Sequence, residues 1–206
     1  DAPESFDARR ILLSDVNGTG TADLIYVGTH GFRVWLNACG NGFKTEPFSI
    51  ANFPDIHSQS DVTVSDLLGT GTTCIVWSSS LKKDQGATLR YIDLMSSRKP
   101  YLMTGYSNSM GKEICLEYRP STAFYLEDYE KGNPWAETVP FPVHCLCKVT
   151  TRDLITGWQT AHSYRYRDAF YDHDEKEFRG FAYVEQKDVE TAEVGEAFRS
   201  RYPDLD

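Results

Sequence analysis

The sequence predicts an all-β protein with one short helix, and three features lead to this expectation. Its 12 Tyr, 11 Phe and 4 Trp residues favour the pleated, half-buried surfaces of β-strands. A glycine-rich segment flanked by short apolar runs occurs twice in the first half. The second half contains long alternating segments separated by turn residues, as in antiparallel strands. We therefore expect two regions, residues 1–105 and 106–206.

The two glycine-rich segments form an internal repeat. Residues 14–26 read SDVNGTGTADLIY and residues 65–77 read SDLLGTGTTCIVW, with six identical positions at an offset of 51 residues. Several short strands in a unit of about 40 to 50 residues are typical of one blade of a β-propeller. Strand patterns at residues 32–37, 47–50 and 61–64, with a turn at residues 40–42, complete such a blade.

The loop of the first copy has the residue types of a calcium site. It resembles the FG-GAP or VCBS repeats of β-propellers, whose loop has the form D-x-[DN]-G-x-G-x-x-D. Oxygen atoms fall at alternate positions, and Gly18 and Gly20 permit the tight turn. Because only two carboxylates are present, the expected affinity is weak, about 10⁻⁴ to 10⁻³ M. The predicted ligands are Asp15, Asn17, Thr19, the carbonyl of Thr21, and Asp23.

An Asx turn that holds its own backbone together without metal explains the same loop equally well. The second copy has Leu68 in place of Asn17 and Cys74 in place of Asp23, which leaves Asp66 as its only carboxylate. We therefore predict that the second loop binds no metal and that its glycines and threonines serve the shape of the turn.

Charge and hydropathy exclude two classes of partner. A formal net charge of −9 has the wrong sign for a protein that neutralises phosphates, so nucleic acid is not an expected partner. No apolar run approaches the roughly 20 residues that cross a bilayer, and the amino end lacks a basic region followed by an apolar one. Because the chain lacks an initial Met and opens just before a motif, we expect a piece of a longer protein.

The five cysteines are odd in number and have no zinc-ribbon spacing. We interpret them as small buried or half-buried side chains in preference to a metal or redox role, and a disulfide stays open as an alternative. They are Cys39, Cys74, Cys115, Cys145 and Cys147.

The second half predicts further strands and the helix. Strands are expected at residues 87–94, 100–106 and 111–118, followed by a long three-stranded meander at residues 143–155, 158–170 and 177–190. A short helix is expected at residues 124–131, with Ser121 or Thr122 as its N-cap and Gly132 as its stop. Neither face of the meander strands is a plain aliphatic stripe, which suits a wall between two polar spaces, and their open edges need neighbouring sheet.

Six ordered motifs give a family resemblance from about residue 11 to residue 190. They resemble the middle region of toxin-complex B components, related to the insecticidal TcdB proteins and the SpvB virulence family. The motifs are DLLGTGT (66–72), RYIDLM (90–95), EYRPST (117–122), FYL (124–126), PFPVH (140–144), and EFRGF (177–181) followed by VEQ (184–186).

This resemblance implies a non-catalytic fragment of a secreted toxin, which before release would reside in the bacterial cytoplasm. In the family, the propeller docks on a pore-forming A component and gates release. Rhs or YD-type repeats build a hollow shell around the toxic effector of the C component. Residues 1–105 would then hold the last propeller blades and residues 106–206 the first shell strands. Departures from the family pattern are four cysteines and two loop residues, namely Cys39, Cys115, Cys145, Cys147, Asn17 and Thr19.

The residues also suggest two rival functions. An ADP-ribosyltransferase would use Glu175 and Glu177 with the serines of residues 78–80, but a catalytic site needs groups that converge in a pocket, and Glu175 lies in a charged turn. Residues 172–174 (DHD) in that turn, and the lone His144 and His162, are more simply solvated or structural. A calcium-dependent adhesion or carbohydrate-binding propeller explains the first half but not the motifs after residue 105.

Overall fold

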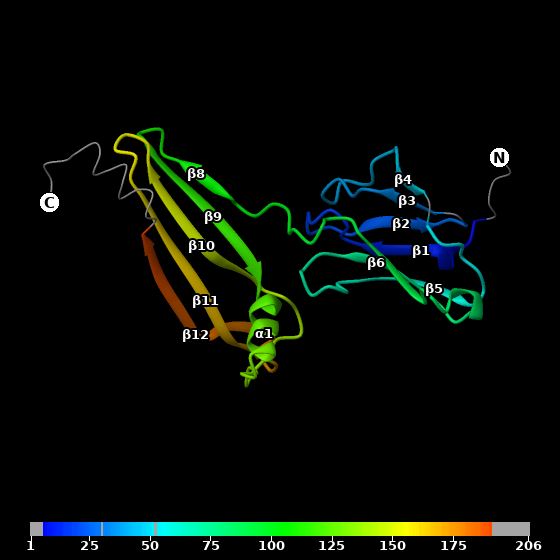
Figure 1. Cartoon of the computed structure of the whole chain (residues 1–206). Coiled ribbons are helices and arrows are strands. Elements are labelled where there is room, and N and C mark those ends of the chain that lie inside the picture. The colour runs from blue at the N-terminus through cyan, green and yellow to red at the C-terminus, as the bar shows by residue number, and fades with distance from the viewer. Residues whose placement is uncertain (1–5, 30, 52, 191–206) are drawn as a thin grey trace, which may run out of the picture. The chain divides into compact units, whose positions relative to one another are not determined.

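The computed structural model describes residues 6–29, 31–51 and 53–190. The last part of the predicted region 106–206, residues 191–206, therefore lies outside the described residues. The chain divides into two compact units, Asp1–Tyr101 and Leu102–Asp206 (Figure 1). The prediction of a mostly β protein with a single α-helix is confirmed for the described residues. None of their helices is long and apolar enough to cross a membrane.

Unit 1 consists of two antiparallel meanders, one for each copy of the repeat. In both, the glycine-rich loop joins the first two strands. The four-stranded sheet has the order β1 (Ile11–Ser14), β2 (Asp23–Val27), β3 (Gly31–Trp35) and β4 (Phe48–Ala51). The three-stranded sheet has the order β5 (Ser60–Ser65), β6 (Cys74–Ser79) and β7 (Leu89–Asp93), and two 3-10 turns, Ala8–Arg10 and Lys82–Asp84, lie before β1 and after β6.

The core of unit 1 lies between these two sheets. Alternation along the strands places Ile25 and Val34 of the first sheet on the side that meets Ile75 and Trp77 of the second. Trp77 is 1% exposed, and the other three are fully buried. Burying such side chains stabilises a fold by about 1.5 to 3 kcal/mol each. The face that each repeat turns to its neighbour is therefore set by strand register.

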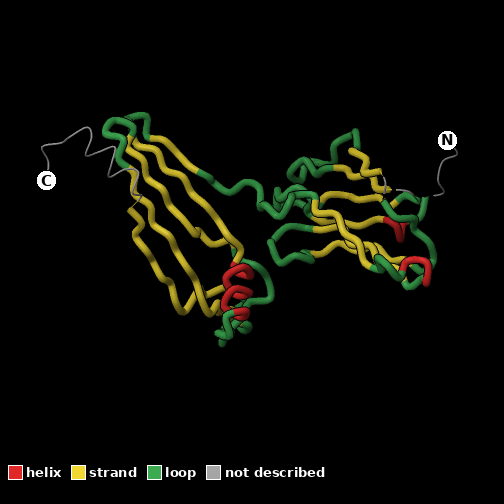
Figure 2. Tube along the Cα trace, viewed as in Figure 1, coloured by secondary structure: helices red, strands yellow, loops and turns green. Residues whose placement is uncertain are grey.

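Unit 2 is a five-stranded antiparallel sheet with α1 packed on one end (Figure 2). Its strand order is β12-β11-β10-β9-β8, and α1 contacts β11 and β9. The bounds are β8 (Gly105–Ser107), β9 (Lys112–Pro120), α1 (Ser121–Glu130), β10 (His144–Asp153), β11 (Gln159–Asp172) and β12 (Glu177–Glu190).

Two predictions for unit 2 are wrong in detail. The N-cap of α1 is Pro120, and Ser121 is already the first helical residue; its hydroxyl accepts an N–H bond from Val143 at 3.0 Å instead of capping the helix. The strand expected at residues 100–106 is only Gly105–Ser107, because Tyr101 has a left-handed φ of 62°, which interrupts extended backbone.

Candidate functional site

The first glycine-rich loop is closed by the carboxylate of Asp15. One oxygen accepts N–H bonds from Asn17, Gly18 and Thr19 at 3.3, 2.7 and 3.1 Å, and the other accepts from Gly20 at 2.8 Å. Two of the predicted ligands, Thr19 and Thr21, pair with each other through hydroxyls 3.0 Å apart. Every one of these contacts joins the loop to itself.

Asp23 closes the base of the same loop. It is fully buried, and its two oxygens accept N–H bonds from Val16 at 3.0 Å and from Asn37 at 2.7 Å. Together with Asp15, all four carboxylate oxygens thus accept backbone N–H groups in this conformation, and the side-chain oxygen of Asn17 accepts from Thr19 at 3.1 Å. Backbone N–H groups of the loop and of Asn37 hold these oxygens, and calcium binding at this loop stays a prediction.

The second loop has the same turn without the full donor set. Asp66 accepts N–H bonds from Thr70 at 3.0 Å and Gly71 at 2.7 Å, and the hydroxyls of Thr70 and Thr72 lie 2.7 Å apart. Leu68 and Cys74 stand where the first copy has an amide and a carboxylate. The shape of this turn therefore needs only the leading aspartate, the glycines and the threonines.

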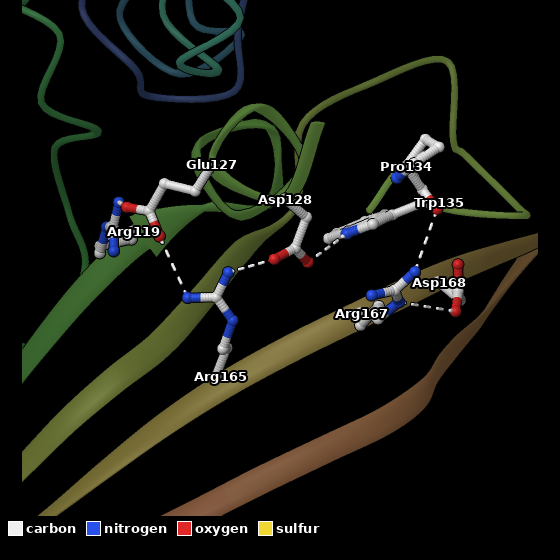
Figure 3. A network of polar contacts seen from close by, with 8 residues as sticks. All are labelled: Arg119, Glu127, Asp128, Pro134, Trp135, Arg165, Arg167 and Asp168. Carbon is white, nitrogen blue, oxygen red and sulfur yellow. Dashed lines mark hydrogen bonds and ion pairs between the residues drawn. The ribbon is translucent and has the colours of Figure 1, made fainter. Parts of the chain in front are cut away.

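Unit 2 contains a second polar cluster, which we call the α1 network, between the helix and the sheet (Figure 3). Arg165 of β11 lies at its centre, with one guanidinium nitrogen 3.1 Å from Glu127 and another hydrogen-bonded to Asp128. Arg119 of β9 binds the other oxygen of Glu127, and the indole of Trp135 donates to Asp128 at 2.8 Å. Its members are Arg119, Glu127, Asp128, Trp135 and Arg165.

Both carboxylates of the α1 network have a lowered pKa. The hydrogen bond from Arg119 is the main cause for Glu127. Burial by itself raises the pKa of Asp128, whose side chain is 8% exposed, but the hydrogen bonds from Trp135 and Arg165 and the Arg165 charge outweigh burial and lower it. The ionised form of each carboxylate is therefore the one that the fold stabilises.

The loop after α1 is attached to the same strand by neighbouring residues. Arg167 donates to the carbonyl of Pro134 at 3.0 Å (Figure 3). Asp168 accepts the N–H of Ala136 at 2.7 Å. Asp168 is 7% exposed and has a left-handed φ of 54°, which is uncommon for a residue other than glycine. The helix and its following loop are thus fixed together onto β11.

Aromatic packing beside the α1 network joins segments that are distant in the sequence. Trp135 lies edge-on to Phe181 of β12, with ring centroids 6.2 Å apart, and Phe124 lies edge-on to Tyr166 at 5.9 Å. The guanidinium of Arg119 lies 4.8 Å from the ring centroid of Phe124. The motifs EYRPST, FYL and EFRGF all contribute residues to this joint, so they correspond to a structural junction.

The acidic residues considered for an ADP-ribosyltransferase lie in and beside the turn between β11 and β12. Glu177 pairs with Arg179 at 2.8 Å. Asp172 accepts N–H bonds from Asp174 and Glu175, both at 3.1 Å, as in an Asx turn. No group of three or more His, Cys, Asp or Glu side chains in the described part of the chain is placed to hold a metal ion.

His162 has a partner that sequence reasoning missed. Its ring nitrogen lies 2.6 Å from a carboxylate oxygen of Asp188 on the paired strand β12, and the Asp188 side chain is 73% exposed. The strand register places these residues opposite each other, so the pair could have been found only once the register was known.

The fold and these clusters define an antiparallel β protein of two units, in which ion pairs attach the helix of unit 2 to its sheet. The chain belongs to the family described as the insecticide toxin TcdB middle/N-terminal region, whose model matches residues 37–200.

Solved structures resemble this chain across nearly its whole length. Crystal structures of TcdB2-TccC3 and of TcdB2-TccC3-Cdc42 each match with a TM-score of 0.77 and 32% identity. Each match covers 91% of this chain and 9% of the matched chain. The Photorhabdus luminescens Tc holotoxin pore, with a mutation in TccC3, matches with a TM-score of 0.76 and 33% identity, covering 90% of this chain and 9% of that one. A search of curated proteins gave no match. This chain therefore spans less than a tenth of those chains.

Proposed function

We propose that this chain is a non-catalytic segment of a secreted toxin-complex B component. Unit 1 supplies blades of a propeller that docks on the pore-forming A component and gates release. Unit 2 begins the Rhs-like shell that, with the C component, encloses the toxic effector. The observation that supports this most strongly is the 32% identity, at a TM-score of 0.77, with a chain in the crystal structure of TcdB2-TccC3.

The edges of the unit 2 sheet support a role within a larger wall. Strand β12 spans 14 residues and pairs with β11, and no second partner strand exists among the described residues. Its neighbouring residues Tyr183 and Val184, which point to opposite faces, are 65% and 57% exposed. An edge strand of this length leaves a row of backbone N–H and C=O groups without a partner strand, so we expect shell strands to pair with it in the full-length protein.

The repeat geometry supports the assignment of unit 1 to a propeller. Two sheets from consecutive repeats pack face to face, and each is an antiparallel meander. Blades of a propeller have this relation to their neighbours. The polar clusters support a structural role, since each ionised group of the α1 network is bonded to a partner of opposite charge.

Protection of the effector tests the shell. The full-length B component that contains this chain would be produced with its C component and treated with a nonspecific protease. We expect the wild-type complex to protect its effector and Arg165→Leu to expose it, because that change opens the junction between α1 and the sheet. Arg152→Leu is the matched control, since the exposed side chain of Arg152 is bonded at 3.2 Å to the side chain of Gln159, with no acidic partner among the described residues. Digestion of the wild-type effector as fast as free effector would refute encapsulation.

Hydrogen exchange tests the docking of unit 1. Adding the A component to the assembled B and C components should slow amide exchange in unit 1 and leave β9 to β12 of unit 2 unchanged. Slower exchange confined to unit 2 would place the docking surface on unit 2 and would contradict the proposed docking of unit 1.

A further inference from the structure

A histidine just before β5 in unit 1 has a buried ring nitrogen without a hydrogen-bond partner. Nε2 of His57 is shielded from solvent, and no acceptor among the described residues lies within hydrogen-bond distance of it. The other ring nitrogen, Nδ1, accepts the backbone N–H of Gln59 at 3.2 Å. Because Nδ1 is an acceptor there, the neutral ring carries its proton on Nε2. Buried polar groups are nearly always paired, so this N–H group calls for a physical explanation.

A carboxylate of the 3-10 turn after β6 lies just beyond hydrogen-bond distance of this nitrogen. Nε2 of His57 is 3.8 Å from an oxygen of Asp84, and the two side chains are 24% and 16% exposed. That oxygen already accepts the hydroxyl of Ser79 at 2.6 Å. A hydrogen bond between a charged nitrogen and a carboxylate is about 2.7 to 2.9 Å long, so a movement of about 1 Å would convert the present contact into such a bond.

The backbone of His57 is held in place, so the imidazole can move by itself. The hydroxyl of Ser60, at the start of β5, accepts the N–H of His57 at 2.8 Å and donates to the His57 carbonyl at 2.9 Å. The N–H of Ser60 donates to the same carbonyl at 3.0 Å. Rotation about the side-chain bonds of His57 therefore changes what the ring contacts and leaves the start of β5 where it is.

Asp84 is the charged group that faces the ring most closely. It forms the ion-pair contact recorded for His57 among the described residues. Strand β6, which supplies Ser79, has no Asp, Glu, Lys or Arg. The charged residues of the loop before β5, of β5 and of the 3-10 turn are exposed, so water and salt screen them. They are Asp55, Asp61, Lys82 and Lys83.

We propose that His57 and Asp84 form a pH-operated latch that closes when the imidazole is protonated. Histidine is the side chain whose charge ordinarily changes between about pH 5 and pH 8. Protonation places a hydrogen on Nδ1, which then opposes the N–H of Gln59, and it places a positive charge beside Asp84. The ring therefore releases Gln59 and donates to Asp84 through Nε2. In the closed latch, the buried N–H group has its partner.

The latch joins the segment that connects the two sheets of unit 1 to the turn that leads into β7. The connecting segment is anchored in the core by Phe53, which lies edge-on to Phe32 with ring centroids 4.1 Å apart. At its other end, the carbonyl of Gln59 accepts the N–H and the hydroxyl of Ser80 at 3.3 and 3.5 Å, which are long hydrogen bonds. Acid should therefore tighten this end of unit 1. The latch goes beyond the proposed function and does not depend on what unit 1 binds.

Hydrogen exchange resolved to single amides tests the latch in the full-length B component assembled with its C component. Exchange rates at about pH 7.5 and about pH 5.5, on either side of ordinary histidine titration, are divided by those of an unstructured chain at the same pH. On acidification, we expect the protection of the Gln59 amide to fall. The amides of Gln85 and Ala87 donate to the carbonyls of Lys82 and Asp84. Their protection should rise about threefold or more, which corresponds to one ordinary hydrogen bond.

Two variants and a control assign these changes to the latch. His57→Gln and Asp84→Asn should each abolish both changes, because Gln does not titrate and Asn carries no charge. Asn also keeps an oxygen for the hydroxyl of Ser79. His162→Gln is the matched control, since it removes another histidine that lies 2.6 Å from an aspartate, in unit 2. The opposite changes in unit 1 should remain intact in this control.

Three outcomes would overturn the inference. The first is equal protection of these amides at both pH values in the wild type. The second is a change of Gln59 and Ala87 in the same direction, which would indicate a general effect of pH on unit 1. The third is a pair of opposite changes that persists in Asp84→Asn. If a variant does not fold, the wild-type measurement and the other variant still decide. Docking and encapsulation have their own readouts, so they stand if the latch fails.

Discussion

A Cβ atom on Gly18 would lie 2.2 Å from Cγ of Pro100, so the first glycine-rich loop lies directly beneath the segment that follows β7. The same atom would lie 3.4 Å from the sulfur of Met95. Gly18 has a φ of 76°, which already favours glycine. The loop is therefore in contact with the stretch by which the chain leaves unit 1, and glycine is required there for two separate reasons.

Gly18→Ala should destabilise unit 1 more than Gly20→Ala. Both glycines have positive φ, so both changes cost about 1 to 2 kcal/mol of backbone strain, but nothing lies within 4 Å of a Cβ on Gly20. The clash with Pro100 should add about 1 kcal/mol or more to the loss at Gly18. Pro100→Ala should recover that excess in a double-mutant cycle measured by urea unfolding. Equal losses at the two glycines would show that the contact with Pro100 is unimportant.

Calcium should stabilise unit 1 only weakly, because the predicted site has two carboxylates and the oxygens of Asp15 and of Asp23 already accept backbone N–H groups. A site with a Kd of about 1 mM would add about 1.4 kcal/mol to the free energy of unfolding at about 10 mM calcium. The measurement is thermal unfolding with calcium or with a chelator. A gain of this size that Asn17→Leu abolishes would establish the predicted calcium site, since Leu occupies the equivalent position 68 of the second loop.

Local periodicity predicted the strands well, because alternation and turn residues are features of neighbouring positions. The last meander strand was expected at residues 177–190 and lies at Glu177–Glu190. The third strand of the repeat escaped a search at fixed offset. Arg33 lies opposite Tyr26 in the first sheet, as Arg90 lies opposite Trp77 in the second. The two arginines are 57 residues apart, whereas the two aromatic residues are 51 apart, so a loop six residues longer in the second copy hides the match.

The α1 network could not be predicted from the sequence, because its partners are far apart along the chain. Arg165 and Asp128 are separated by 37 residues, and alternation assigns Arg165 only to one face of a strand. Which acidic side chains of α1 reach Arg165 depends on the residue at which α1 begins. The sequence pattern suggested Ser121 or Thr122 as the N-cap, whereas Pro120 occupies that position. Helix placement and strand register together determine the pairing.

Arg165→Leu should lower the free energy of unfolding of unit 2 by about 2 to 3 kcal/mol, because it leaves the nearly buried carboxylate of Asp128 without its cation. Arg152→Leu should cost less than about 0.5 kcal/mol, because the bonds between Arg152 and Gln159 are exposed. Urea unfolding followed by hydrogen exchange of the β11 amides measures both. Similar losses in the two variants would mean that the α1 network does not stabilise the sheet.

Thiol labelling should separate the cysteines into distinct classes. All five are free, with Cys39 and Cys115 exposed and Cys74 and Cys145 buried. Burial raises the pKa of Cys145 to about 12, so almost no reactive thiolate forms there near neutral pH. We expect maleimide to modify Cys39 and Cys115 first, as identified by mass spectrometry of the native chain. Fewer than five modified cysteines in denaturant without reductant would instead reveal a disulfide.

The contribution of Arg165 should decrease in acid. The pKa values of Asp128 and Glu127 are lowered in the folded chain from ordinary values of 3.8 and 4.5. A lowered folded pKa gives stability that is present above the unfolded pKa and is lost as the pH falls through the folded pKa. The difference in unfolding free energy between wild type and Arg165→Leu should therefore be full near pH 7 and shrink progressively below about pH 4.5.

Urea unfolding of both proteins at several pH values would measure this difference directly. The side chain of Glu127 is 34% exposed and that of Asp128 is 8% exposed, so screening by solvent weakens the first pair, and most of the pH-dependent loss should come from Asp128. Asp128→Asn provides the control. In that background the Arg165→Leu change should show little dependence on pH, because Asn does not titrate. A difference between wild type and Arg165→Leu that stays constant from neutral to acidic pH would mean that Arg165 stabilises the junction by packing of its aliphatic part and not by its charge.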